Sequence, residues 1–185
     1  MNALIGFATW YGATSDSADI IADVLREKGA EVRVANLEKE LVEDISEFDL
    51  VVVGAGVRMG RWNGNADKFI DRHKKELRDK KVAIFASAAG ASISAEKGET
   101  DKTQDAYEKH LTKKAEKYSL NPVSMKMFGG VFDYNKMGWL TRRLFGRFKK
   151  DLREAGFEEE DGVFDTRSIE EIRKWAEKLV EDVVE

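Results

Sequence analysis

Cysteine is absent from this sequence of 185 residues, and proline occurs once, as Pro122. Disulfide bonds, thiolate nucleophiles, iron–sulfur clusters and cysteine-ligated zinc are therefore excluded, and any redox centre must be a bound cofactor. We expect no metal site. No repeat or Pro-rich linker divides the chain, and its length is close to that of one ordinary domain. We expect residues 1–185 to form a single domain.

A basic excess is also missing, because 31 Lys and Arg residues stand against 35 Asp and Glu residues, a formal net charge of -4. We therefore expect no nucleic-acid partner. No window approaches the roughly 20 apolar residues of a membrane-spanning helix. The N-terminal MNALIGFATWYG lacks the basic start of a signal peptide. We expect a cytoplasmic protein; peripheral attachment to the inner face of the membrane and oligomer formation are left open.

Apolar runs with strand character alternate with segments of helical period, a pattern typical of βαβ units around a parallel sheet. Strands are expected at residues 3–8, 31–36, 50–54, 81–86 and 124–131, and helices at 15–28, 66–78, 103–118 and 168–184. Several strands are nearly continuous hydrophobic runs, as strands covered on both faces require. We predict an α/β fold with a doubly wound, five-stranded parallel sheet, helices on both faces, and an insertion at residues 133–166 after strand five.

The loop T-W-Y-G-A-T at residues 9–14 joins the first expected strand to the first helix. Thr9 and Thr14 supply hydroxyl groups, Gly12 permits close backbone approach, and the helix start offers free N–H groups with a partial positive charge. These features favour phosphate binding without a basic side chain. A Walker loop is excluded because it needs Lys followed by Ser or Thr. The alternative is an ordinary strand–helix turn with hydroxyl caps.

Three glycines occur within seven residues of the second loop, G-A-G-V-R-M-G at residues 54–60. Glycine tolerates positive φ, so this backbone can pass flat against a planar ligand. The partial G-x-G pattern does not follow the first strand, which disfavours NAD. For Arg58, Arg61 and Trp62 the alternative is a solvated loop with one apolar lid residue.

Small residues fill the third loop, S-A-A-G-A-S at residues 87–92. Their exposed backbone N–H and C=O groups can form hydrogen bonds with the edge of a heterocycle. The alternative is that residues 87–92 form a simple flexible loop. Doubly wound sheets bind ligands beyond the carboxyl ends of their strands, so we expect the three loops to converge. A phospho-receiver would need acidic residues where Thr9 and Ala55 stand, and is excluded.

Together these motifs resemble the flavodoxin superfamily, whose first loop T-x-x-G-x-T binds the phosphate of flavin mononucleotide (FMN). V-A-N-L at 34–37, V-V-G-A-G-V-R-M-G-R at 52–61 and F-G-G-V-F-D-Y at 128–134 are similar to the menaquinone-dependent protoporphyrinogen dehydrogenase subgroup. The resemblance implies a flavodoxin-like fold, FMN as cofactor, and an oxidoreductase of haem biosynthesis with a quinone or other small-molecule redox partner. The alternative is a flavodoxin-like electron carrier with no organic substrate of its own.

By this resemblance the first loop would hold the phosphate, and the other two would flank the flavin ring. The cofactor-binding residues so implied are Thr9, Trp10, Tyr11, Gly12, Ala13, Thr14, Ala55, Gly56, Val57, Arg58, Met59, Gly60, Ser87, Ala88, Ala89 and Gly90. No catalytic side chain is assigned, because the chemistry is expected on the flavin. His73 and His110 lie beside lysines on expected helices, and we interpret both as solvated surface residues.

A basic amphipathic helix is expected at residues 136–152, within the insertion. One face carries Met137, Leu140, Leu144, Phe148 and Leu152, and much of the rest carries Arg142, Arg143, Arg147, Lys149 and Lys150. With Trp139 beside it, this helix is suited to an anionic membrane near a quinone, or to substrate carboxylates. The candidate substrate residues are Arg61, Trp62, Arg142 and Arg143. The alternatives are packing on the sheet edge and a flavin-free interaction module that docks a partner.

Overall fold

Five parallel strands form the centre of the structure, a computed structural model that describes residues 1–136 and 138–184. In spatial order they are β2 (Glu31–Asn36), β1 (Asn2–Ala8), β3 (Leu50–Arg58), β5 (Lys81–Ser87) and β6 (Ser124–Phe128). A two-residue strand, β4 (Arg61–Trp62), turns back antiparallel on the end of β3. The winding direction reverses between β1 and β3, where such sheets bind ligands. The predicted doubly wound, five-stranded parallel sheet is confirmed.

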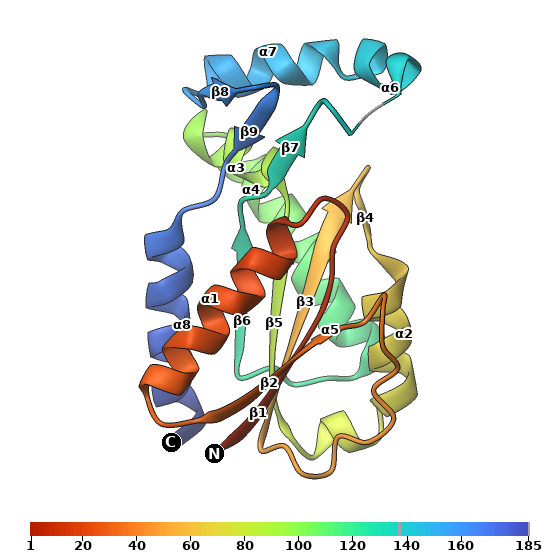
Figure 1. The fold of residues 1–185 in the computed structure, drawn as a ribbon, viewed down its shortest axis with the longest axis vertical. Coiled ribbons are helices and arrows are strands. Elements are labelled where there is room, and N and C mark those ends of the chain that lie inside the picture. Colours follow the sequence, from red (N-terminus) through yellow and green to blue (C-terminus); the bar gives the residue numbers. More distant parts are fainter. Residues whose placement is uncertain (137, 185) are drawn as a thin grey trace.

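Helices cover both faces of the sheet (Figure 1). On one face lie α1 (Ala13–Glu27) and α8 (Ile169–Val184), and on the other lie α2 (Gly64–His73) and α5 (Lys113–Tyr118). Successive residues of β1 serve opposite faces: Leu4 packs in the cluster with α2, and Ile5 packs in the cluster with α1. Both are fully buried, which explains why the strands read as continuous apolar runs.

The segment between β5 and β6 is more divided than its sequence pattern predicts. The expected helix at 103–118 is three consecutive pieces: α4 (Thr100–Tyr107), the π-helical segment η2 (Glu108–Thr112) and α5. Before them stands α3 (Ala89–Glu96), so the flexible-loop alternative for residues 87–92 is wrong from Ala89 onward. Its Ala, Ser and Gly residues carry no apolar period that could announce a helix. The helix expected at 66–78 likewise ends at His73, followed by a 3₁₀ turn, η1 (Glu76–Arg78).

The insertion forms a second, small antiparallel sheet with two helices, set beyond the carboxyl ends of the main strands (Figure 1). Its elements are β7 (Val131–Asp133), α6 (Trp139–Leu144), α7 (Gly146–Glu154), β8 (Glu159–Glu160) and β9 (Val163–Asp165). The strand expected at 124–131 therefore ends at Phe128. The chain then changes sheets at Gly129, where an added Cβ would lie 1.9 Å from the carbonyl oxygen of Thr166.

The single helix expected at residues 136–152 is wrong, because the structure has two helices interrupted at Phe145. Phe145 leaves the helical path and packs against Phe132 and Phe148, with ring centroids 5.7 Å and 6.2 Å away. Gly146 follows it, and glycine weakens helix continuity. Of the expected apolar face, Met137 and the side chains of Leu140 and Leu144 lie outside the described residues.

Candidate functional site

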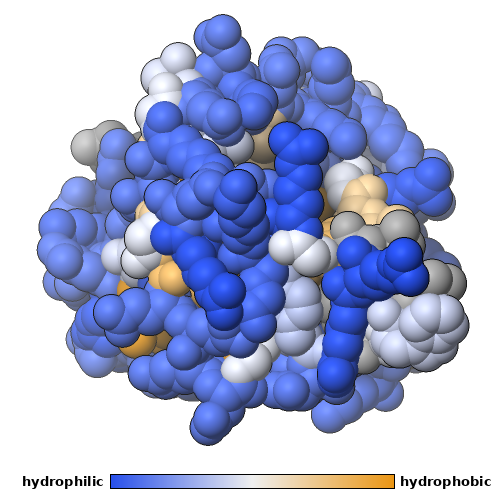
Figure 2. Space-filling view, turned by 90° about the horizontal axis from the view of Figure 1, so that it is seen from above, coloured by the Kyte–Doolittle hydropathy of each residue, from blue (hydrophilic) through white to orange (hydrophobic). Residues whose placement is uncertain are grey.

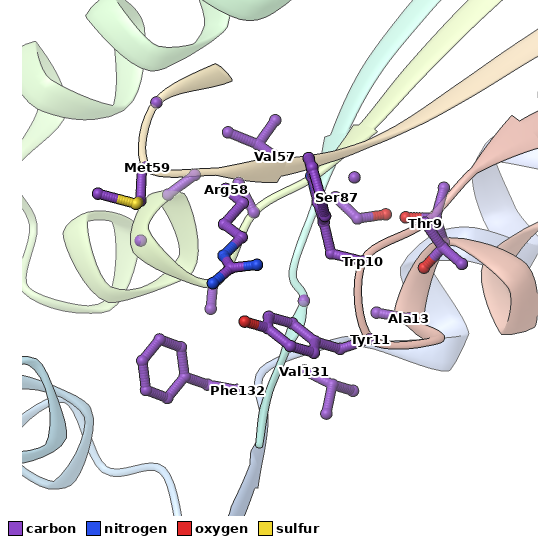
Figure 3. Close-up of a pocket in the computed structure, with 18 of the residues that line it drawn as sticks. Thr9, Trp10, Tyr11, Ala13, Val57, Arg58, Met59, Ser87, Val131 and Phe132 are labelled. Carbon is purple, nitrogen blue, oxygen red and sulfur yellow. The ribbon is translucent and has the colours of Figure 1, made fainter. Parts of the chain in front are cut away.

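A cavity of about 330 Å³ lies at the carboxyl ends of β1, β3 and β5, on the side facing the insertion (Figure 3). All three predicted loops reach it. The loop residues that line it are Thr9, Trp10, Tyr11, Ala13, Thr14, Gly56, Val57, Arg58, Met59, Gly60, Ser87, Ala88, Ala89 and Gly90. Of the residues implied as cofactor contacts, Gly12 and Ala55 do not line the cavity. The structure thus brings the predicted set together, and their contact with a ligand stays a prediction.

The first loop has the geometry of an anion cradle. Gly12 takes a φ of 101° just before α1, and its N–H donates to Thr9 Oγ1 at 3.0 Å. No side chain caps α1, so the first amides of this helix remain free for a ligand. Thr14 is buried against the second loop, where a Cβ on Gly56 would lie 3.1 Å from Thr14 Oγ1. The alternative of an ordinary turn with hydroxyl caps does not describe this helix start.

Two residues that the sequence did not single out fasten the first loop to the second. Asn63, which is buried, donates from its amide nitrogen to the carbonyl oxygen of Thr9 and to Glu38 Oε1, both at 3.0 Å. Glu38 Oε2 accepts from the Thr9 N–H at 3.3 Å. The Asn63 backbone N–H donates to the Gly56 carbonyl at 3.0 Å, and its side-chain oxygen caps α2. Only the capping role had a sequence signal, Asn before a helix start.

The second loop is a hairpin turn between β3 and β4. Its two central residues, Met59 and Gly60, have φ values of 50° and 70°. Positive φ at both positions is what a two-residue hairpin needs, and it suits glycine but strains methionine. Met59 lines the cavity and is 77% exposed. The strained residue therefore stands at the cavity rim, where functional sites commonly keep such conformations.

Arg58 connects the second loop to the aromatic pair of the first. Its Cζ lies 5.5 Å from the ring centroid of Trp10 and 5.4 Å from that of Tyr11. In Figure 3 the Arg58 side chain extends from β3 toward Tyr11, and Phe132 approaches from the insertion. Cation–π attraction at this distance holds the rings at the cavity mouth.

Ser87, at the end of β5, provides a test of whether the cavity suits a flavin. The residue is buried and lines the cavity, yet its Oγ has no hydrogen-bond partner among the described residues. A buried hydroxyl without a partner costs about 1–3 kcal/mol. The polar edge of a flavin ring could supply that partner, and the α1 start could hold its phosphate. The residues present therefore fit FMN.

The insertion supplies a wall that sequence reasoning did not assign to the site. Phe132, Phe145 and Phe148 line the cavity, and the rings of Phe132 and Phe148 lie 4.5 Å apart. The hydroxyl of Tyr134 donates to the Phe145 carbonyl at 2.9 Å, which fixes the break between α6 and α7. Leu152 packs with this cluster and is fully buried, so the apolar face of α7 covers the insertion itself.

The prediction that both histidines are solvated surface residues is wrong. His73 is buried, with Nε2 2.9 Å from the Val42 carbonyl oxygen. His110 is 7% exposed and lines the cavity. Burial, followed by the charges of Lys109 and Lys114, lowers the pKa of His110 to about 4. The lysines next to each histidine in the sequence indicated exposure to solvent. Adjacent residues of a helix point about 100° apart, however, so a residue beside an exposed lysine can be buried.

None of the four candidate substrate residues lines the cavity. Trp62 is 5% exposed and belongs to the core cluster, so the alternative of a solvated loop with one apolar lid residue is wrong for this residue. The β4 strand turns it inward while Arg61 points to solvent. Arg142 donates from Nε to the Tyr134 carbonyl at 2.8 Å and thereby holds the insertion. Arg143 is exposed on α6.

Comparison with known proteins gives consistent results. The profile of the flavodoxin domain matches residues 4–156. Protoporphyrinogen IX dehydrogenase (quinone) of Escherichia coli K12 is 26% identical over 146 residues, which are 77% of this chain and 75% of that protein. A flavodoxin from the domain Archaea superposes with a TM-score of 0.58 at 14% identity, covering 100% of both chains. A Streptococcus pneumonia flavodoxin gives 0.55 at 17% identity, covering 100% of this chain and 98% of that one. With this sheet order and loop arrangement, the profile match shows that the chain belongs to the flavodoxin domain family.

Proposed function

We propose that the protein, acting as a single domain, binds FMN in the three-loop cavity and is an oxidoreductase that oxidises a porphyrinogen and passes the electrons to a quinone. Membership of the flavodoxin domain family and the fit of the cavity support FMN as the cofactor. The 26% identity to the E. coli protoporphyrinogen IX dehydrogenase supports the substrate class. The observation that carries the proposal is the aromatic wall of Phe132, Phe145 and Phe148.

The residues of the three loops would have distinct tasks toward FMN. The free amides at the start of α1, with Thr9 and Thr14, would hold the phosphate. The Ser87 hydroxyl and the backbone of the second and third loops would hold the ring. Bound FMN supplies the electron-transfer chemistry, and the protein orients it and excludes water.

The aromatic wall is what distinguishes an enzyme from a carrier in this proposal. A carrier needs only an exposed flavin edge, whereas an enzyme needs a second surface to hold its substrate. Aromatic side chains offer that surface to a planar, apolar molecule, because rings stack in offset or edge-to-face arrangements. Phe132, Phe145 and Phe148 face the flavin loops across the cavity and thus provide such a surface.

The surface of α6 and α7 is the part of the protein that would contact a membrane containing the quinone. Trp139 is 77% exposed, and Arg143 and Arg147 have no acidic partner among the described residues. Lys149 and Arg153 instead both form ion pairs with Glu159. Seen from this side, the molecule is largely hydrophilic, with small apolar areas between charged side chains (Figure 2). We propose electrostatic, peripheral contact of residues 136–152 with an anionic membrane surface, where quinones dissolve.

Across residues 1–136 and 138–184, no helix has the length and apolar character needed to cross a bilayer. Contact through α6 and α7 would therefore involve surface residues of the insertion.

A flavodoxin-like electron carrier is the second candidate. It is favoured by the fold, since the superposition on the archaeal flavodoxin spans this whole chain. A carrier would deliver electrons to a protein partner and would not turn over an organic substrate.

Anaerobic turnover separates the two candidates. The FMN-loaded protein is mixed with protoporphyrinogen IX and a water-soluble quinone, and porphyrin fluorescence is followed. We expect oxidation that depends on both reagents, and at least a tenfold loss of kcat/KM in Phe148→Ala. The matched control is Phe157→Ala, because Phe157 packs with the same cluster but does not line the cavity. Absence of turnover, together with electron transfer from the dithionite-reduced protein to a redox protein, would establish the carrier instead.

A further inference from the structure

The cavity contains one side chain of a type whose unperturbed pKa lies near neutrality, His110. Among the described residues that line it there is no Asp, Glu or Lys; the ionisable ones are Tyr11, Arg58 and His110. As residue types, tyrosine and arginine have unperturbed pKa values well above neutrality. Of these three residue types, only histidine has an unperturbed pKa near neutrality.

His110 is held in an unusual piece of backbone. It lies in the π-helical segment η2, a rare conformation that often marks functional sites. The residue is more than nine-tenths buried, and its ring makes no hydrogen bond with any described residue. The segment packs next to the hairpin turn, since a Cβ on Gly60 would lie 2.9 Å from Lys109 Nζ. An unpartnered imidazole therefore faces the cavity beside the second flavin loop.

We propose that His110 is the proton-exchanging group of this redox site: its imidazole is neutral beside oxidised FMN and takes up a proton when the bound FMN is reduced. The inference rests on FMN as the cofactor of the proposed function, and does not depend on the substrate. Two electrons come from the substrate, or from dithionite in a test, and one accompanying proton enters the flavin. His110 holds a second proton, and both protons and both electrons leave to the quinone.

Electrostatics gives the direction of this change. Burial lowers the pKa of His110 and keeps its ring neutral, and the charges of Lys109 and Lys114 act in the same direction. Lys114 is itself paired with Asp67 at 2.6 Å. The strands β5 and β6 and the helix α4, which also pack against η2, contribute no charge that shifts it, while Arg58 lines the same cavity. A negative charge on the reduced cofactor favours the imidazolium and raises its pKa.

Nuclear magnetic resonance of the histidine rings tests the proposal in the FMN-loaded wild-type protein. The His110 ring is titrated with pH in the oxidised form and again after reduction with dithionite. Because the pKa of His110 is lowered to about 4, the ring can hold a proton near neutral pH only if its midpoint rises by at least two pH units, and we expect a rise of that size on reduction. The chain has only two histidines, so His73 is an internal control. It lies on α2 outside the cavity lining, and its signals should be the same in both forms.

The midpoint potential of bound FMN provides an independent readout with the variant His110→Gln. At pH values between the His110 midpoints of the oxidised and the reduced form, each two-electron reduction takes up one extra proton. The midpoint potential of the wild type should therefore fall by about 30 mV per pH unit more than that of the variant. The variant should lack this extra slope. Equal slopes, or a His110 midpoint unmoved by reduction, would overturn the inference alone. Failure of the wild type to bind FMN would overturn it together with the proposed function. If the variant does not fold, the wild-type titration decides.

Discussion

The amide nitrogen of Asn63 donates a 3.0 Å hydrogen bond to the carbonyl oxygen of Thr9, across 54 residues of sequence. The same side chain caps α2 through the Asn65 N–H and contacts Glu38. One buried residue therefore sets the spacing between the loop that would hold the phosphate and the loop that would flank the flavin.

Replacing Asn63 by alanine should weaken both stability and FMN binding. The change removes a helix cap, worth about 1 kcal/mol, and leaves the Thr9 carbonyl without this donor, at a cost of about 1–3 kcal/mol. We expect urea unfolding to show a loss of about 2–4 kcal/mol and FMN titration to show at least tenfold weaker binding. Asn65→Ala, on the same helix, is the control and should stay within about 0.5 kcal/mol. FMN binding by Asn63→Ala at wild-type affinity would refute the assigned role.

Arg58 should contribute to FMN binding through Trp10 and Tyr11. Loss of its cation–π contacts frees the two rings, and each such contact is worth about 0.5–1 kcal/mol at exposed sites. Arg58→Gln is expected to weaken FMN binding about fivefold, measured by quenching of flavin fluorescence. Arg61→Gln removes the neighbouring charge on the same hairpin without touching the cavity. An equal effect of both variants would show that only net charge matters.

Gly129 should tolerate no side chain. An alanine there would place its Cβ 1.9 Å from the backbone oxygen of Thr166, and a backbone atom cannot move away as a flexible side chain can. Gly129→Ala should lower the free energy of unfolding by about 3 kcal/mol or more, in a thermal or urea experiment. Gly146 starts α7 with open space around it, so Gly146→Ala should be neutral or slightly stabilising. A neutral Gly129→Ala would contradict the close packing of the insertion on the sheet.

The FMN-free protein should lose stability in mild acid because of His110. Its pKa is lowered to about 4 in the folded state, by burial and then by Lys109 and Lys114, from an ordinary value of 6.5. The unfolded chain therefore binds this proton first as the pH falls. His110 leaves the free energy of unfolding unchanged above pH 6.5. Between pH 6.5 and about 4 its titration lowers the free energy of unfolding, by up to about 3 kcal/mol.

His110→Gln cannot take up that proton, so its stability should fall less over the same pH range. Urea unfolding of both proteins at pH 7 and pH 4.5 provides the comparison. A parallel decline in the two would mean that His110 is not held neutral in the fold.

The sheet could be predicted because its determinants are local. Residues such as Leu4 and Ile5 are both buried, on opposite faces, so each strand is apolar throughout. The loops could be predicted because parallel strands end at one edge, which places Thr9 and Ser87 on one cavity.

The unpredicted features depend on contacts between distant residues. Asn63 reads as a helix cap, and nothing in its neighbourhood indicates the bond to Thr9. The inward turn of Trp62 follows from the pairing of β4 with β3. His110 owes its position to a π-helical segment that has no apolar signature. The break at Phe145 comes from packing against Phe132, which lies 13 residues earlier in the chain.

The central claim is that the α1 start holds a phosphate and the three loops hold a flavin. The most direct measurement is titration of the FMN-free protein with FMN and, separately, with riboflavin, which has the same ring but no phosphate. We expect one FMN bound per chain, at least 100-fold more tightly than riboflavin, a difference of about 2.7 kcal/mol. Equal affinity for the two flavins, or no binding of either, would contradict the claim.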